Sequence, residues 1–92
     1  MAFGFGKALD VLRDGDAVTR LGWNAPRQSV FLVPGSTIEV AADRPLGKAL
    51  PFLVGESVEY RPHIDLRTAN GEIVTWQPTI SDVLADDWDY VR

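Results

Sequence analysis

The sequence predicts a small α+β domain, in which an N-terminal helix and a short C-terminal helix accompany an antiparallel sheet that includes an Asn-Gly hairpin. Three observations predict this class: helical spacing of apolar residues near the N-terminus, alternating strand-like segments, and an Asn-Gly pair between two such segments. The chain has 92 residues, near the low end for an independently stable core, and fits a single domain over residues 1–92.

The first helix is predicted from the apolar pattern at the N-terminus. Apolar side chains recur there at helical spacing, namely Phe5, Ala8, Leu9 and Leu12. Gly15 follows a polar end, and a glycine in this place commonly ends a helix. We therefore expect a short amphipathic helix over residues 5–14.

Strands are expected over residues 17–21, 29–33 and 37–40. The first alternates apolar and polar residues and leads into an irregular loop over residues 22–26, which are rich in turn-forming types. The second is β-branched, aromatic and nearly all apolar, which favours a central strand buried on both faces and ended by Pro34-Gly35. Residues 41–55 have no clear period and predict a long loop with room for a helical turn.

The strongest turn signal is Asn70-Gly71, which lies between the strand-like residues 57–68 and 72–77. Asn-Gly favours a two-residue type I′ turn, because both central positions need positive φ. Such a turn pairs Arg67 with Val74 and Asp65 with Trp76. Alternation then predicts a core face with Ile64, Leu66 and Ile73, and a polar face with Asp65, Arg67, Val74 and Trp76.

The C-terminal segment predicts a short helix and an edge strand. Thr79 or Ser81 can cap a helix that runs to about Ala85, and Asp82 lies in the first turn, where the helix dipole favours a carboxylate. Residues 86–91 follow as a possible edge strand, with Trp88 and Tyr90 on one face.

Composition narrows the classes of function. Nine Lys and Arg stand against thirteen Asp and Glu, and the resulting net charge of −4 disfavours long nucleic acid but not a small anion. No long apolar run is present, so we expect no membrane span and a cytoplasmic location. The chain has no Cys, which removes disulfides and sulfur-ligated zinc, and we expect association between copies to supplement the small core.

Catalytic motifs are hard to find. His63 is the single histidine, and as a general base or metal ligand it would need partners such as Asp65 or Asp82. No Ser lies in a nucleophile elbow, and the Gly-rich residues 3–7 lack P-loop spacing. We therefore expect no catalytic residue, no metal and no cofactor, with His63 in a structural or surface role.

Three Trp in so short a chain suggest either nucleobase stacking or anchors of the core or of a subunit interface. These are Trp23, Trp76 and Trp88. Arg61 and Arg67 are equally open, because each suits a phosphate or a nearby carboxylate. The residues alone do not decide between these readings.

Several segments, in order along nearly the whole chain, resemble the Thoeris anti-defence protein 2 family of phage proteins. They are residues 5–9 with Gly15, 20–24, 31–36, 60–65 and 76–88. The most specific parts are Gly-Trp-Asn at residues 22–24 and Ser-Asp-Val-Leu-Ala-Asp-Asp-Trp at residues 81–88. Residues 41–55 carry little of the resemblance.

The resemblance implies a homotetramer that sequesters glycocyclic ADP-ribose, the immune signal made by bacterial TIR enzymes, in pockets at subunit boundaries in the host cytoplasm. It also implies that some members bind CBASS cyclic dinucleotides at a separate site. By this resemblance Trp23 and Trp76 would stack on bases, Asn24 and Asp82 would orient the ligand, and Arg61 would meet phosphate. The alternatives are a hydrolase of the cyclic nucleotide and a direct protein inhibitor of a host defence enzyme.

Overall fold

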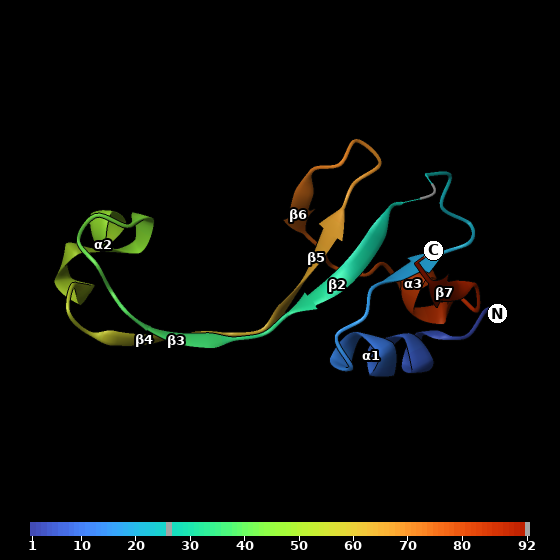
Figure 1. Ribbon diagram of the computed structural model, residues 1–92, viewed down its shortest axis with the longest axis horizontal. Coiled ribbons are helices and arrows are strands. Elements are labelled where there is room, and N and C mark those ends of the chain that lie inside the picture. The colour runs from blue at the N-terminus through green and yellow to red at the C-terminus, as the bar shows by residue number, and fades with distance from the viewer. Residues whose placement is uncertain (26, 92) are drawn as a thin grey trace.

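The computed structural model describes residues 1–25 and 27–91 and shows an α+β fold with a body and a projecting arm (Figure 1). Pro26, the last residue of the predicted irregular loop, lies outside the described residues. The elements are α1 (Phe5–Arg13), β1 (Val18–Arg20), β2 (Ser29–Val33), β3 (Ser36–Glu39), α2 (Pro45–Ala49), the 3₁₀ helix η1 (Pro51–Leu53), β4 (Ser57–Tyr60), β5 (His63–Arg67), β6 (Ile73–Thr75), α3 (Ile80–Leu84) and β7 (Trp88–Tyr90). The predicted fold class is confirmed.

The body is a five-stranded antiparallel sheet in the order β6-β5-β2-β1-β7, packed against α1. The helix ends as predicted, because the Gly15 N–H donates to the Leu12 carbonyl and the Asp16 N–H donates to the Val11 carbonyl. β2 lies in the middle of the sheet, as its apolar sequence indicated, although only Ser29 and Val30 of that strand are fully buried.

The core forms where α1 meets the sheet. Its buried members are Ala8, Val11, Leu12, Val18, Val30 and Trp88. Burying a large apolar side chain contributes about 1.5–3 kcal/mol, so this small set supplies much of the stability of the body. Trp88 is fully buried although it lies on the edge strand β7, because α1 and neighbouring aromatic rings cover it.

The arm comprises residues 36–60, that is, β3, α2, η1 and β4. It continues the β2–β5 pair in the same register, since Val33 faces His63 and Ser36 faces Tyr60. The predicted strand over residues 57–68 is therefore two strands in two sheets, because Pro34-Gly35 and Arg61-Pro62 interrupt the ladder. The predicted long loop over residues 41–55 contains two short helices at the tip of the arm.

The arm projects away from the body and is not covered by it. Among the described residues, no helix or strand of the body contacts an element of the arm. The molecule measures 48 × 26 × 24 Å, and its radius of gyration is 16.4 Å. A compact domain of this length would have a radius of gyration of about 12 Å. None of the helices in the described part of the chain is both long enough and apolar enough to span a membrane.

The Asn-Gly hairpin forms, but the prediction of its turn type and register is wrong by one residue. Gly71 has φ 89°, whereas no described residue other than glycine has positive φ, so Asn70 does not adopt the type I′ conformation. The loop has three residues and is closed by the Gly71 N–H donating to Thr68 and the Thr68 N–H donating to Glu72. This matches a type I turn followed by a glycine bulge, which L-residues at the first two positions adopt without strain.

The change of register moves side chains to opposite faces of the sheet. Asp65 faces Thr75 and Arg67 faces Ile73, and the Trp76 N–H donates to the Ile64 carbonyl. A slip of one residue reverses the face of every side chain on a strand. Trp76 therefore packs with the core, whereas Ile73, predicted to be in the core, is 54% exposed.

Candidate functional site

Trp88 lies at the centre of a cluster of aromatic rings, the Trp88 cluster, which consists of Phe5, Trp23, Trp76 and Trp88. Its ring centroid lies 5.4 Å from that of Trp23 and 6.1 Å from that of Trp76, and both pairs are edge-to-face. Phe5 contacts it from α1 at 5.6 Å. Trp88 is fully buried, while Trp23 and Trp76 remain partly exposed. The indoles of Trp23 and Trp76 thus lie at the surface and pack against the buried ring of Trp88.

Backbone hydrogen bonds fix the main chain at Trp23 and at Trp76. The Trp23 N–H donates to the Arg20 carbonyl at 3.0 Å, which closes a turn after β1. The Trp76 N–H donates to the Ile64 carbonyl at 2.9 Å, which continues the β5–β6 ladder. Asn24 follows Trp23 directly and is exposed.

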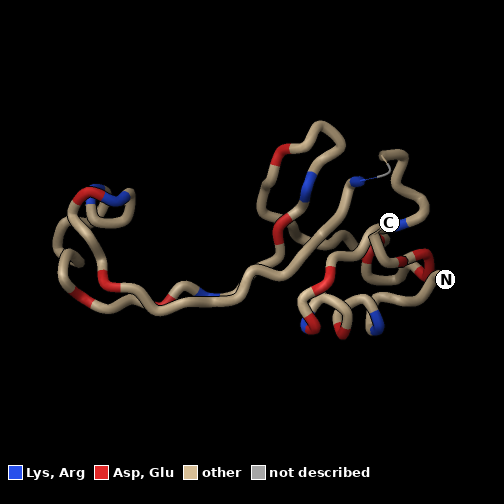
Figure 2. Tube along the Cα trace, in the orientation of Figure 1, with Lys and Arg blue, Asp and Glu red and all other residues tan. Residues whose placement is uncertain are grey.

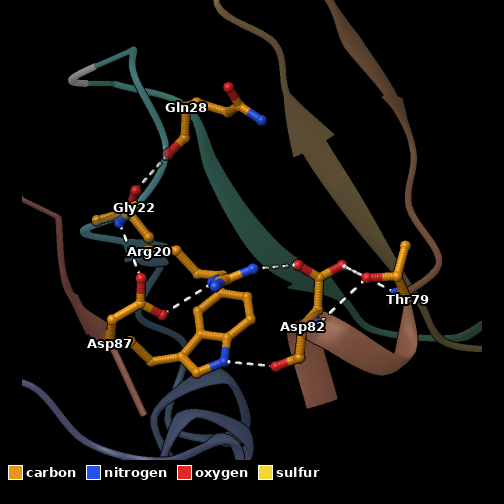
Figure 3. A network of polar contacts seen from close by, with 8 residues as sticks. Arg20, Gly22, Gln28, Thr79, Asp82 and Asp87 are labelled. Atoms are coloured by element: carbon orange, nitrogen blue, oxygen red, sulfur yellow. Dashed lines mark hydrogen bonds and ion pairs between the residues drawn. The ribbon is translucent and has the colours of Figure 1, made fainter. Parts of the chain in front are cut away.

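Arg20 joins β1 to two carboxylates beside the cluster (Figure 3). Its Nε donates to Asp87 Oδ1 at 2.8 Å, and its Nη1 donates to Asp82 Oδ1 at 3.0 Å. The side chains of Arg20 and Asp82 are 21% and 10% exposed, so water screens this ion pair little. Asp87 also accepts the Gly22 N–H at 2.8 Å through Oδ2.

Asp82 belongs to a capping box at the start of α3. The Thr79 hydroxyl accepts the Asp82 N–H, and the Asp82 carboxylate accepts the Thr79 N–H at 2.8 Å. The Asp82 backbone carbonyl accepts the indole N–H of Trp88 at 2.9 Å. Thr79 is thus the cap, one of the two candidates that the sequence offered, and both Asp82 carboxylate oxygens are engaged within the chain.

Hydrogen bonds and ion pairs within this network shift the pKa values of Arg20, Asp82 and Asp87. Burial raises the pKa of Asp82, but hydrogen bonds from the Thr79 backbone, Arg20 and the Thr79 hydroxyl outweigh it, so this pKa lies below its ordinary value. The hydrogen bond from Arg20 lowers the pKa of Asp87, and the same bond raises the pKa of Arg20. All three groups are therefore held in their charged forms.

Arg61 lies elsewhere, at the joint between body and arm. Its Nη1 is 3.5 Å from Glu59 Oε1, and the Arg61 side chain is 81% exposed. It lines a hollow of about 300 Å³ together with Gly35, Ser36, Thr37, Glu59, Tyr60 and Pro62. Figure 2 shows acidic and basic positions interspersed along both arm and body, and not one continuous basic stripe.

His63 lies at the start of β5, with its Nε2 3.2 Å from Asp65 Oδ1. The His63 side chain is 47% exposed. Within residues 1–25 and 27–91, no three His, Asp or Glu side chains gather in a way that could hold a metal ion.

The structure brings together three of the five residues that the resemblance singled out. Trp23 and Trp76 contact Trp88, and Asp82 accepts its indole N–H. Asn24 follows Trp23 in the chain and is exposed. Arg61 is not part of this group. Sequence reasoning missed the central roles of Arg20 and Asp87, because the contacts of Arg20 span more than 60 positions of the chain. The only signal for these two was that they lie within segments that carry the resemblance, whereas Trp88 was already a candidate anchor of the core.

Fold and site together define a small α+β domain that presents two half-buried indoles over a buried third, beside a network of ion pairs. The Thoeris anti-defense 2-like domain model matches residues 3–91, and the chain belongs to this family. Thoeris anti-defense 2 of Bacillus phage SP01 is 39% identical over 87 residues, which cover 95% of this chain and 92% of that protein. Membership of the family supports a phage anti-defence role for the chain.

Proposed function

We propose that the chain binds glycocyclic ADP-ribose and holds it intact in the cytoplasm of the infected host, so that the immune signal does not reach its effector. The observation that carries the proposal is the pair of half-buried indoles, Trp23 and Trp76, fixed on Trp88. Stacking on an aromatic side chain contributes about 1–3 kcal/mol per base. Indoles that are already ordered lose little further entropy on binding.

Sequestration needs tight binding, because each protein site removes one signal molecule and must hold it. Tight binding of this kind needs a closed pocket. A nanomolar Kd corresponds to about −12 kcal/mol, more than two stacked bases provide. Arg20 is already paired with two carboxylates, and Arg61 lies at the joint of the same chain. We therefore propose that a second copy completes the pocket and supplies the cation that meets phosphate.

The arm supports association between copies. A two-stranded ribbon is marginally stable alone in water, and among the described elements nothing from the body covers this one. Its tip exposes 74% of Phe52, and a hollow of about 470 Å³ lies between β3 and α2. These features fit a homotetramer built through the arms.

A separate site for cyclic dinucleotides is the second part of the proposal. The hollow around Arg61 at the joint favours it, because Ser36, Thr37 and Tyr60 are among the residues that line it together with Arg61. Hydroxyl and guanidinium donors are suited to phosphate oxygens.

Recovery of the ligand tests sequestration. The protein is saturated with glycocyclic ADP-ribose, incubated for hours, denatured and analysed by liquid chromatography with mass spectrometry. We expect the ligand to be released unchanged in the amount bound. A linear product would instead establish a hydrolase, for which His63 and Asp65 would be the first candidates. Absence of small-molecule binding, with a stable complex to a host protein, would favour the protein inhibitor.

A further inference from the structure

We infer that Arg20 and Asp87 are positioning residues, which hold the turn at Leu21, Gly22 and Trp23 so that the Trp23 indole is presented to the ligand. The inference rests on the proposed function, because it takes Trp23 as the group that meets the base. Neither Arg20 nor Asp87 is required to touch the ligand.

Three successive backbone amides of the turn are held by these two residues. The Leu21 N–H donates to the Asp87 carbonyl at 2.9 Å, and the Gly22 N–H donates to Asp87 Oδ2 at 2.8 Å. The Trp23 N–H donates to the Arg20 carbonyl at 3.0 Å. Of these three bonds, only the one from Gly22 uses a side chain, so it is the contact that the identity of residue 87 controls.

The two residues are themselves fixed. The planar guanidinium of Arg20 bridges Asp87 and Asp82, and Asp82 is locked into the capping box of α3 by Thr79. A forked, planar donor holds two carboxylates in one geometry, which a flexible ammonium does not. The turn is thus tied through Asp87 and Arg20 to the start of α3.

Gly22 fits this arrangement closely. A Cβ atom at this position would lie 2.9 Å from Asp87 Oδ2, closer than such atoms pack. A side chain there would push against the Asp87 carboxylate, which would have to shift relative to the residue 22 N–H. Glycine at position 22 therefore allows this bond in its observed geometry.

The direction in which affinity changes when the Asp87 charge is removed separates positioning from charge repulsion. A carboxylate near an anionic ligand repels it, so removing the charge alone would strengthen binding. Positioning predicts the opposite, because both oxygens of Asp87 are used within the chain and neither is left for the ligand.

The test compares Asp87→Asn with Asp86→Asn by calorimetry, using glycocyclic ADP-ribose as the probe. Both changes remove one negative charge at adjacent positions, but Asp86 is exposed and outside the network. An amide at position 87 offers only one acceptor, so it must lose either Arg20 or the Gly22 N–H. We expect Asp87→Asn to weaken binding about tenfold or more, the scale of losing one hydrogen bond to a charged group, while Asp86→Asn binds as wild type or more tightly.

Gly22→Ala provides a second variant that leaves all charges and the core in place. We expect it to weaken binding while the thermal unfolding midpoint changes little, and to speed hydrogen exchange of the residue 22 amide in the free protein. Equal affinity of Asp87→Asn and Asp86→Asn, or unchanged affinity of Gly22→Ala, would overturn the inference. If the wild-type protein itself fails to bind the probe, the proposed function fails instead, and the exchange measurement still reports whether the turn is held.

Discussion

At the scale of single residues, the role of each side chain at the site depends on the groups that surround it. The family resemblance implies that Trp23 and Trp76 stack on bases, and the structure places both indoles against Trp88. Trp88, which both of them contact, is fully buried, so for this tryptophan the core-anchor alternative is confirmed. The predicted role of Asp82 in orienting the ligand stays a prediction. In the structure its carboxylate binds Thr79 and Arg20.

Acid pH should weaken the fold through Asp82 and Asp87. Both have pKa values below the ordinary value, so the folded state binds fewer protons than the unfolded chain. Their contribution is fully present above the unfolded pKa of about 3.9 and is lost as pH falls through the lower folded values. We expect the urea midpoint to fall between pH 5 and pH 2.

Asp87→Asn should reduce this acid dependence, because one of the shifted carboxylates is gone. Asp86→Asn, for which no network contact is lost, should retain the wild-type slope. Identical slopes for wild type and Asp87→Asn would show that the Arg20 ion pair adds no pH-dependent stability.

At the scale of elements, local patterns predicted the helices and most strands well. The apolar spacing of α1 and the cap of α3 are local signals, and both proved correct. The hairpin register was wrong, because Asn-Gly fits either a two-residue turn or a three-residue loop, and the choice depends on burying Trp76 with Ile64. The split between β4 and β5 was missed, although Pro62 marked it.

Thr79→Ala should destabilise the protein by about 1 kcal/mol, the usual effect of removing an N-cap side chain. The hydroxyl accepts the Asp82 N–H and donates to the Asp82 carboxylate, so both contacts disappear. Ser81→Ala is the matched control, since Ser81 is exposed and is not the cap. Chemical denaturation measures both, and equal effects would mean that the capping box does not stabilise α3.

At the scale of the whole molecule, the arm is the feature that sequence patterns could not reveal. Periodicity indicates which residues form strands, but not that a two-stranded ribbon projects from the body with no other element covering it. The exposed apolar side chains of the arm are Ile38, Leu50, Phe52, Val54 and Tyr60. Their exposure is accounted for if copies of the chain cover one another, as the proposed tetramer requires.

Phe52→Ser should shift the assembly towards smaller species without unfolding the body. Phe52 is 74% exposed at the tip of the arm, so its loss removes apolar contact area and creates no cavity in the core of the body. Native mass spectrometry measures the distribution of species, with Lys7→Ser on the exposed side of α1 as the control. A monomeric wild-type protein, or an unchanged distribution in Phe52→Ser, would rule out the tip as an assembly surface.

The most direct test of the central claim is calorimetric titration of glycocyclic ADP-ribose into wild-type protein, Trp23→Ala and Tyr90→Ala. Tyr90 is an aromatic control that is 44% exposed and whose ring contact is to Phe3, outside the Trp88 cluster. Loss of one stacked base predicts a Kd roughly tenfold to a hundredfold weaker for Trp23→Ala, and wild-type affinity for Tyr90→Ala. Tight binding by the wild type with undiminished affinity in Trp23→Ala would contradict the account.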